Sequence, residues 1–277
     1  MKIRHRFGFA SGDGKVLRFL NKKNLLYQRD ELIITVEAFE DDNEFDALSN
    51  LAHKCDAVDV VTAVYEQSEL DAAKWLVIRS EWWNQYPQPQ EEMGYIYTTY
   101  DTSMYCSGCE EYNCGKGLLQ KKPFNIKKAP NWGPRNFLML NWVPDELFVS
   151  LKAATVLEKS KLTGFSLWDV FDKSQKPFDT IKQIHVENFL PKSLNVESIK
   201  ERLVCPNCGF EKIVPNVGPL RFEKTTFENI DYDIVKTEDK FGEIGCDSAI
   251  LVSHNFYDTV IKNNIGKGLV FEPVELV

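Results

Sequence analysis

The distribution of apolar positions near the N-terminus predicts several strands and one short helix. Three segments have the β-branched and apolar content that strands favour, namely residues 31–39, 59–66 and 73–83. Between the first two, Phe45, Leu48 and Leu51 recur at a spacing of three residues, which places them on one face of a helix. The pattern therefore predicts a mixed α/β segment over residues 1–90.

A pair of prolines marks the predicted domain boundary. Pro87 and Pro89 lie in the stretch YPQPQEEMG, and each proline lacks an amide donor and restricts the residue before it. We therefore expect an N-terminal α/β segment over residues 1–90 and a second domain over residues 91–277.

Three glycines close to the N-terminus predict a tight turn. The stretch GFASGDGK, from Gly8 to Lys15, lacks the spacing of a phosphate-binding loop and has no following serine or threonine. Asp13 followed by Gly14 is typical of a type I′ hairpin turn. The sequence therefore predicts a hairpin here.

The second domain contains two segments in which the same landmarks occur in the same order. Each has an extended segment, a CxxC pair, an aspartate, an apolar strand that ends in Val-Ser, a helix and a final strand. The matching residues are Cys106 and Cys205, Asp145 and Asp247, and Ser150 and Ser253. This shared order predicts one supersecondary unit used twice.

Each of the two serines is expected to cap a helix. Ser150 and Ser253 stand at the end of an apolar strand and the start of an amphipathic helix, where a hydroxyl can accept a hydrogen bond from a helix amide. The first helix is predicted from Leu151 to about Ser160, with Gly164 as a candidate left-handed residue near its end.

Two CxxC pairs about a hundred residues apart predict a zinc site. Each pair places two thiolates on one turn, and Gly209 permits the positive φ that such a turn needs. Four thiolates form a closed tetrahedral shell, which zinc ordinarily occupies. The predicted ligands are Cys106, Cys109, Cys205 and Cys208. The predicted fold is α+β, with the N-terminal α/β segment followed by two diverged strand–helix–strand repeats joined by this four-cysteine zinc site.

The first cysteine pair leaves one alternative open. The stretch CSGCEEYNCG offers three thiols for two positions, so Cys114 could replace Cys106 or Cys109. We favour Cys106 and Cys109, because their spacing matches that of the second pair. A closed thiolate shell has no open position for substrate, so the zinc is expected to be structural. The N-terminus shows no export signal, so we expect a cytoplasmic protein with reduced thiols.

The charge balance favours a protein partner over a nucleic acid. The net charge is −8, whereas a nucleic-acid binder usually shows a basic surplus. The lysine-rich stretch over residues 115–130 supports one alternative, a zinc-ribbon nucleic-acid-binding module. An acidic surface suits a basic protein partner. Trp82, Trp83 and Tyr86 form an aromatic cluster that would mark a contact surface if it were exposed.

The sequence contains no recognisable catalytic constellation. The four histidines form no HExxH pair, and there is no GxSxG motif. No apolar run is long enough to span a bilayer. We therefore expect a protein that is not an enzyme, needs no small-molecule substrate and has no membrane segment.

These motifs resemble those of the bacterial double-CXXCG motif proteins. The resemblance is carried by CSGC, CPNCG, residues 145–170 and residues 250–276, and the last of these also resembles the C-terminal pattern of polymorphic-toxin immunity proteins. One departure is that Cys109 is followed by Glu110, so the first Cys-Gly pair is Cys114-Gly115. The resemblance implies a cytoplasmic, non-enzymatic protein that sequesters a toxin domain.

Overall fold

The chain divides into two compact units. The computed structural model describes residues 1–103, 119–243 and 245–277. One unit comprises Met1–Glu69 with Val217–Pro219, and the other comprises Leu70–Asn216 with Leu220–Val277. The sequence places the boundary near residue 90, whereas the contacts place it between Glu69 and Leu70. The reason is that the strand Trp75–Ser80 pairs with strands near the C-terminus.

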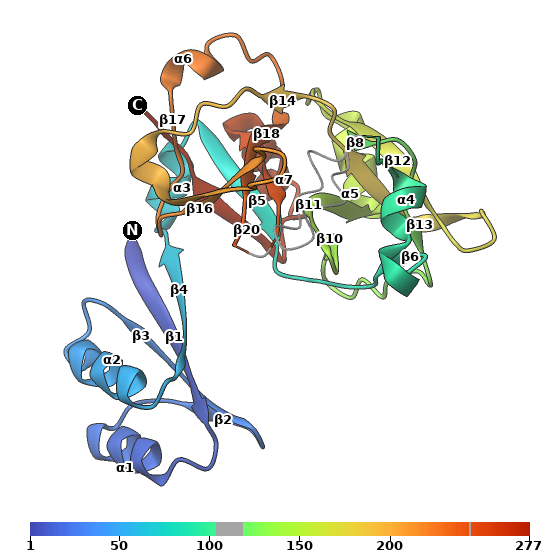
Figure 1. The fold of residues 1–277 in the computed structure, drawn as a ribbon. Coiled ribbons are helices and arrows are strands. Elements are labelled where there is room, and N and C mark those ends of the chain that lie inside the picture. The colour runs from blue at the N-terminus through green and yellow to red at the C-terminus, as the bar shows by residue number, and fades with distance from the viewer. Residues whose placement is uncertain (104–118, 244) are drawn as a thin grey trace. The chain divides into compact units, whose positions relative to one another are not determined.

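The first unit is a four-stranded antiparallel sheet with two helices on one face (Figure 1). Its elements are β1 (Lys2–Ala10), α1 (Gly14–Lys23), β2 (Gln28–Arg29), β3 (Ile33–Phe39), α2 (Phe45–Lys54) and β4 (Val58–Val64). The strand order β2-β3-β1-β4 and the chain order βαββαβ are those of a split βαβ motif. Phe7 and Val36 of the sheet pack against Leu20 and Leu48 of the helices.

The predicted hairpin near the N-terminus is wrong, because this turn begins a helix. The Asp13 carboxylate accepts hydrogen bonds from the amides of Lys15 and Val16, at 2.8 and 3.2 Å, and so caps α1. Asp13 has an extended backbone, with φ −74° and ψ 98°. An Asp-Gly pair is compatible with both a hairpin turn and a helix N-terminus. The helix forms here because the Val16 and Leu20 side chains that follow are buried.

The second unit contains two large sheets and several short elements (Figure 1). One sheet has the order β10-β11-β13-β12-β9-β6, and the other has the order β15-β16-β18-β19-β5-β20, with β14 beside β18. The first sheet comprises β10 (Phe137–Leu140), β11 (Val143–Ser150), β13 (Pro177–His185), β12 (Ser166–Phe171), β9 (Asn125–Ile126) and β6 (Pro87–Gln88). The second comprises β15 (Ile199–Val204), β16 (Glu211–Pro215), β18 (Ile234–Phe241), β19 (Asp247–Ser253), β5 (Trp75–Ser80), β20 (Leu269–Pro273) and β14 (Phe189–Leu190).

Short helices and two strand pairs complete the described chain. The helices are α3 (Gln67–Ala72), η1 (Glu91–Met93), α4 (Tyr95–Thr99), α5 (Leu151–Lys159), η3 (Val196–Ser198), α6 (Lys224–Phe227) and α7 (His254–Lys262). The strand pairs are β7 (Tyr100–Asp101) with β8 (Leu119–Gln120), and β17 (Arg221–Phe222) with β21 (Glu275–Leu276).

The predicted α+β fold of two strand–helix–strand repeats is wrong. Strands make up 40% and helices 23% of the structure, so the protein is mostly β. The two strands that flank each helix do not pair with each other, because β13 lies between β11 and β12, and β5 lies between β19 and β20. The apolar pattern of a buried strand does not specify its neighbour in the sheet, so the sequence could not reveal these inserted strands.

The two predicted helix caps are confirmed. Ser150 and Ser253 have nearly the same backbone conformation, with φ −65° and −68° and ψ 159° and 163°. The Ser150 hydroxyl accepts from the amide of Ala153 at 3.2 Å, and the Ser253 hydroxyl accepts from the amide of Phe256 at 3.3 Å. These bonds begin α5 and α7 at the predicted positions. At the other end α5 stops at Lys159, so Gly164 lies beyond its cap.

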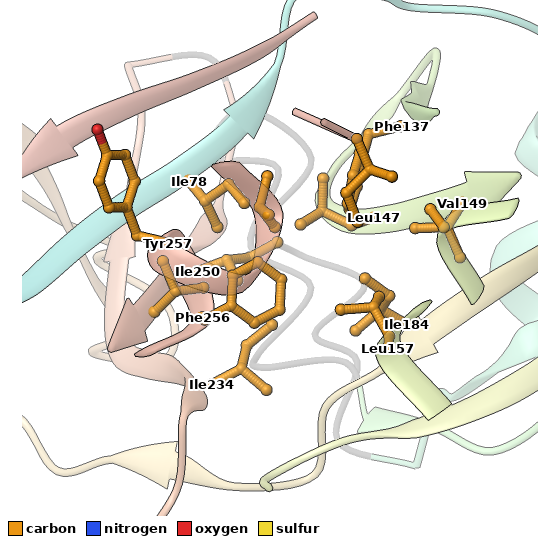
Figure 2. Close-up of a cluster of buried hydrophobic side chains, with 14 of the residues drawn as sticks. Ile78, Phe137, Leu147, Val149, Leu157, Ile184, Ile234, Ile250, Phe256 and Tyr257 are labelled. Carbon is orange, nitrogen blue, oxygen red and sulfur yellow. The ribbon is translucent and has the colours of Figure 1, made fainter. Parts of the chain in front are cut away.

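The main core of the second unit lies where the two sheets face each other. Figure 2 shows Ile78, Ile234, Ile250 and Phe256 on one side, opposite side chains of the other sheet and α5. The opposing side chains are Phe137, Leu147, Val149, Leu157 and Ile184. Burial of these apolar groups holds the sheets together and fixes the loops at their ends.

Candidate functional site

The second CxxC pair forms a compact turn between β15 and β16. The Cys205 amide donates to the carbonyl of Phe210 at 2.8 Å, and the Gly209 amide donates to the carbonyl of Cys205 at 2.9 Å. Gly209 has a φ of +69°, in the left-handed region that the sequence predicted for it. Cys205 is buried, and Cys208 is half-buried. This turn holds two thiols on one short loop, as a zinc knuckle requires.

The other predicted ligands lie outside the described residues. Cys106 and Cys109, and the alternative ligand Cys114, belong to residues 104–118. Within the described part of the chain, no group of three or more His, Cys, Asp or Glu side chains is placed to hold a metal ion. The described structure therefore shows one of the two predicted cysteine turns, and the four-cysteine site remains a prediction.

The residues that flank the two cysteine segments lie within electrostatic reach of each other. Burial raises the pKa of Tyr100 well above its ordinary value, and Asp145, Glu146 and Asp247 raise it further. Tyr100 lies six residues before Cys106 in the sequence. Lys212, four residues after Cys208, acts in turn on the pKa of Asp247. Tyr100 and Lys212 are therefore both within electrostatic range of Asp247.

Asp145 and Asp247, the paired landmarks of the sequence, are neighbours in the structure. The Asp145 carboxylate accepts from the amide of Ser248 at 3.4 Å. Burial raises the pKa of Asp247 to about 7, the Asp145 carboxylate contributes to this rise, and Lys240 and Lys212 oppose the shift. Two acids this close disfavour double ionisation.

A lysine ties the loop after β18 to the strand that follows the CxxC turn. The Lys212 ammonium donates to the carbonyls of Glu243 and Gly245, at 2.7 and 3.2 Å. The Gly242 amide also donates to the carbonyl of Ile213 at 3.0 Å. Cys246, which follows this tie, is half-buried in the connection to β19.

A buried polar network joins the two sheets. Lys236 of β18 donates to the Glu146 carboxylate of β11, and Gln183 of β13 donates to the same carboxylate at 2.9 Å. Gln183 and Gln120 exchange hydrogen bonds at 2.6 and 2.9 Å. Burial lowers the pKa of Lys236, but Glu146 and Asp145 outweigh it and raise the pKa above its ordinary value. Each of these four side chains has a polar partner inside the protein, so the network links the two sheets through satisfied hydrogen bonds.

The predicted aromatic cluster is partly exposed. The structure adds Trp142 to it, a residue that the sequence did not identify. Trp82 packs against the core and meets Trp132 edge to face, with ring centroids 5.4 Å apart. Tyr86 is 38% exposed and meets Trp142, which is 46% exposed, at 4.7 Å between ring centroids. Trp142 lies in the turn between β10 and β11. Its approach to Tyr86 is tertiary, so no local signal could have revealed it.

The described part of the lysine-rich stretch has one lysine in an ion pair and three further exposed lysines. Lys121 pairs with Asp101 at 2.6 Å, and Lys122, Lys127 and Lys128 are exposed. An ion pair with a carboxylate lowers the positive potential that a phosphate backbone would need. The described lysines therefore give the nucleic-acid alternative no specific support.

Comparisons with known proteins do not assign the chain to a family. No family model matches the chain, and no curated protein matches it. Among the described residues, no helix combines the length and the apolar content needed to cross a bilayer.

Proposed function

We propose that the protein is a non-enzymatic zinc-binding protein that binds a protein partner, as a bacterial immunity protein that neutralises a toxin domain. The observation that carries this proposal is the Cys205–Gly209 turn. It combines a positive φ at Gly209, a backbone bond from the Gly209 amide to Cys205, and a second bond that closes the hairpin. This is the local geometry that holds two thiolates for one tetrahedral ion.

Zinc would be held by Cys205 and Cys208 together with two thiols of the first segment. The favoured pair there is Cys106 and Cys109, with Cys114 as the alternative. A closed thiolate shell supplies a crosslink between distant segments and no reactive position. The thiols must stay reduced to bind the ion, and the cytoplasm is the compartment that keeps them so.

The partner would be a protein with a basic surface. The net charge of −8 speeds encounter with such a partner and suppresses binding to other acidic surfaces. The exposed Tyr86 and Trp142 add apolar contact area to this acidic surface. The buried polar network is satisfied by groups inside the protein and needs no partner to complete it.

Metal analysis of the purified full-length protein tests the zinc site. We expect one zinc per chain in protein prepared without chelator, and loss of that zinc in Cys205→Ser and in Cys208→Ser. Cys55→Ser is the matched control, because Cys55 lies in the first unit and should retain full zinc. Single serine substitutions at Cys106, Cys109 and Cys114 then identify the other ligands. Full zinc in a Cys205→Ser, Cys208→Ser double variant would show that the site is wrong.

Binding to toxin domains encoded beside the gene tests the partner. We expect a stable complex with one of them and protection of cells that express that toxin. If no neighbouring toxin domain binds although zinc is present, the immunity function fails and the zinc site stands. Salt-sensitive binding of the protein to DNA or RNA would favour the zinc-ribbon alternative instead.

A further inference from the structure

The segment from Ser80 to Ser103 has an unusual charge pattern. It contains four acidic residues and no lysine or arginine, and six of its residues are tyrosine or tryptophan. Its acidic residues are Glu81, Glu91, Glu92 and Asp101. Of these, Glu81, Glu91 and Glu92 are exposed. The segment therefore combines negative charge with aromatic rings, which is the chemistry that attracts guanidinium and ammonium groups.

Tyr86 of this segment and Trp142, in the turn between β10 and β11, form an exposed aromatic pair that we call the aromatic ledge. Their rings meet edge to face, with an interplanar angle of 64°. Below them lies the buried Tyr95, whose ring stacks on Trp142 at 6.3 Å and whose hydroxyl donates to the Trp142 carbonyl at 3.4 Å. One exposed ring therefore rests on a buried one, which fixes its orientation before any partner binds.

Main-chain and amide hydrogen bonds connect the two backbone segments that carry the ledge. The Asn141 amide donates to the Gln85 carbonyl at 3.0 Å, and the Asn141 side chain donates to the same oxygen at 2.6 Å. The Asn84 amide donates to the Met139 carbonyl at 3.0 Å. These bonds join the segment that carries Tyr86 to the turn that carries Trp142.

Several residues here have a backbone conformation that is unfavourable for their type. Gln85 and Trp142 have φ values of 66° and 70°, and Glu92 and Met93 have values of 50° and 53°. Positive φ is rare for residues other than glycine and is most unusual for a bulky side chain such as tryptophan. Such strain persists where the surrounding structure holds a functional surface in place. Two of these residues, Gln85 and Trp142, lie at the ledge.

A different ring of the same segment, that of Trp82, already binds a guanidinium group. The Arg135 guanidinium lies over the ring of Trp82, 5.3 Å from its centroid. Trp82 also packs against Trp132. The ledge offers equivalent ring surfaces to solvent, with acidic side chains nearby in the chain and no basic residue of its own segment to occupy them.

We propose that the aromatic ledge of Tyr86 and Trp142 is the contact site for an arginine-bearing basic segment of a protein partner. The inference rests on the proposed function, since it assigns the surface through which that partner binds. The guanidinium group stacks on the exposed rings, and Glu81, Glu91 and Glu92, which flank Tyr86 in the sequence, supply the complementary charge. Arginine is preferred over lysine because its planar group stacks on an aromatic face.

Titration with defined peptides tests the ledge without knowledge of the natural partner. The probes are acetylated hexa-arginine, hexalysine and hexaglutamate, used at physiological salt with ¹⁵N-labelled full-length protein. We expect the Trp142 indole resonance, assigned from Trp142→Phe, to move with hexa-arginine, to move less with hexalysine and not to move with hexaglutamate. No movement with hexa-arginine would overturn the proposal.

A pair of variants separates the ledge from general electrostatic attraction. We expect the Tyr86→Ala, Trp142→Ala double variant to lose at least about tenfold in affinity for hexa-arginine, with zinc content and unfolding temperature as controls for folding. Tyr232→Ala is the matched control, since Tyr232 is an exposed aromatic residue of the same unit outside the ledge, and it should bind as the wild type does. Unchanged affinity in the double variant, or an equal loss in the control, would overturn the proposal.

The toxin assay distinguishes failure of the ledge from failure of the proposed function. If the double variant still binds and neutralises a neighbouring toxin domain with wild-type affinity, the ledge is not the contact site and the immunity function stands. If no toxin domain binds the wild type while hexa-arginine binding depends on Tyr86 and Trp142, the ledge stands and the immunity function fails.

Discussion

Glu146 of β11 and Lys236 of β18 form a buried ion pair that joins the two sheets of the second unit. The side chains are 4% and 6% exposed, and they lie 90 residues apart in the sequence. Gln183 satisfies the second carboxylate oxygen at 2.9 Å. The pair therefore links β11 of one sheet to β18 of the other in the interior of the unit.

Breaking this pair from one side should destabilise the second unit strongly. Glu146→Gln leaves the buried Lys236 ammonium without its counter-charge. Lys236→Met leaves the buried Glu146 carboxylate without its counter-charge. We expect each to lower the free energy of unfolding by about 3–5 kcal/mol, measured by urea unfolding. The double variant should be less destabilised than the sum of the two singles, because no uncompensated charge remains. Additive losses would show that the two side chains do not interact.

The two capping serines should contribute similar amounts of stability. The Ser150 hydroxyl also donates to the Asn136 side chain at 2.9 Å, and the Ser253 hydroxyl donates to the Asp233 carboxylate at 2.6 Å. We expect Ser150→Ala and Ser253→Ala each to cost about 1–2 kcal/mol in urea unfolding. Ser253→Thr keeps the hydroxyl and should cost much less. A Ser253→Ala protein as stable as the wild type would contradict the cap.

Gly164 should tolerate no side chain. Its φ is +94°, and an added Cβ would collide with the Ile234 carbonyl oxygen and lie 2.8 Å from the Tyr232 Cβ. We expect Gly164→Ala to lower the unfolding temperature sharply in calorimetry. Gly133→Ala is the matched control, because Gly133 has a φ of +51° with open space around it and carries only the backbone strain, about 1 kcal/mol. Equal effects of the two substitutions would refute the close approach.

Because of Asp247, the free energy of unfolding should fall as the pH rises from about 4 to about 7. Its pKa is raised from 3.8 to about 7 by burial and by Asp145, so the folded state holds a proton that the unfolded state has lost. This contribution is complete below about pH 4 and disappears as the pH rises through about 7, and it amounts to at most about 4 kcal/mol.

Asp247→Asn isolates the contribution of this carboxyl group. The variant should match the wild type near pH 4 and exceed it in stability at pH 8, as measured by urea unfolding at each pH. Asp145 contributes to the raised pKa, so Asp145→Asn should reduce the pH dependence. A constant difference between variant and wild type from pH 4 to 8 would show that Asp247 does not titrate in this range.

The local features of this protein could be predicted from its sequence. The helix over Phe45–Lys54, the start of α5 and α7 at the two serines, and the left-handed Gly209 in the CxxC turn all depend on residues within a few positions along the chain. Such features follow from capping groups, apolar spacing and the steric freedom of glycine. The zinc ligands follow from spacing alone, and they remain a prediction.

Only the tertiary structure decided the sheet order, the inter-sheet ion pair and the aromatic ledge. β5 enters the sheet between β19 and β20, and Trp142 reaches Tyr86 from a distant turn. A strand's alternation of apolar and polar residues specifies which face is buried, but it is equally satisfied by many neighbours. The choice among them depends on packing between segments far apart in the chain, and that information is absent from any local window of sequence.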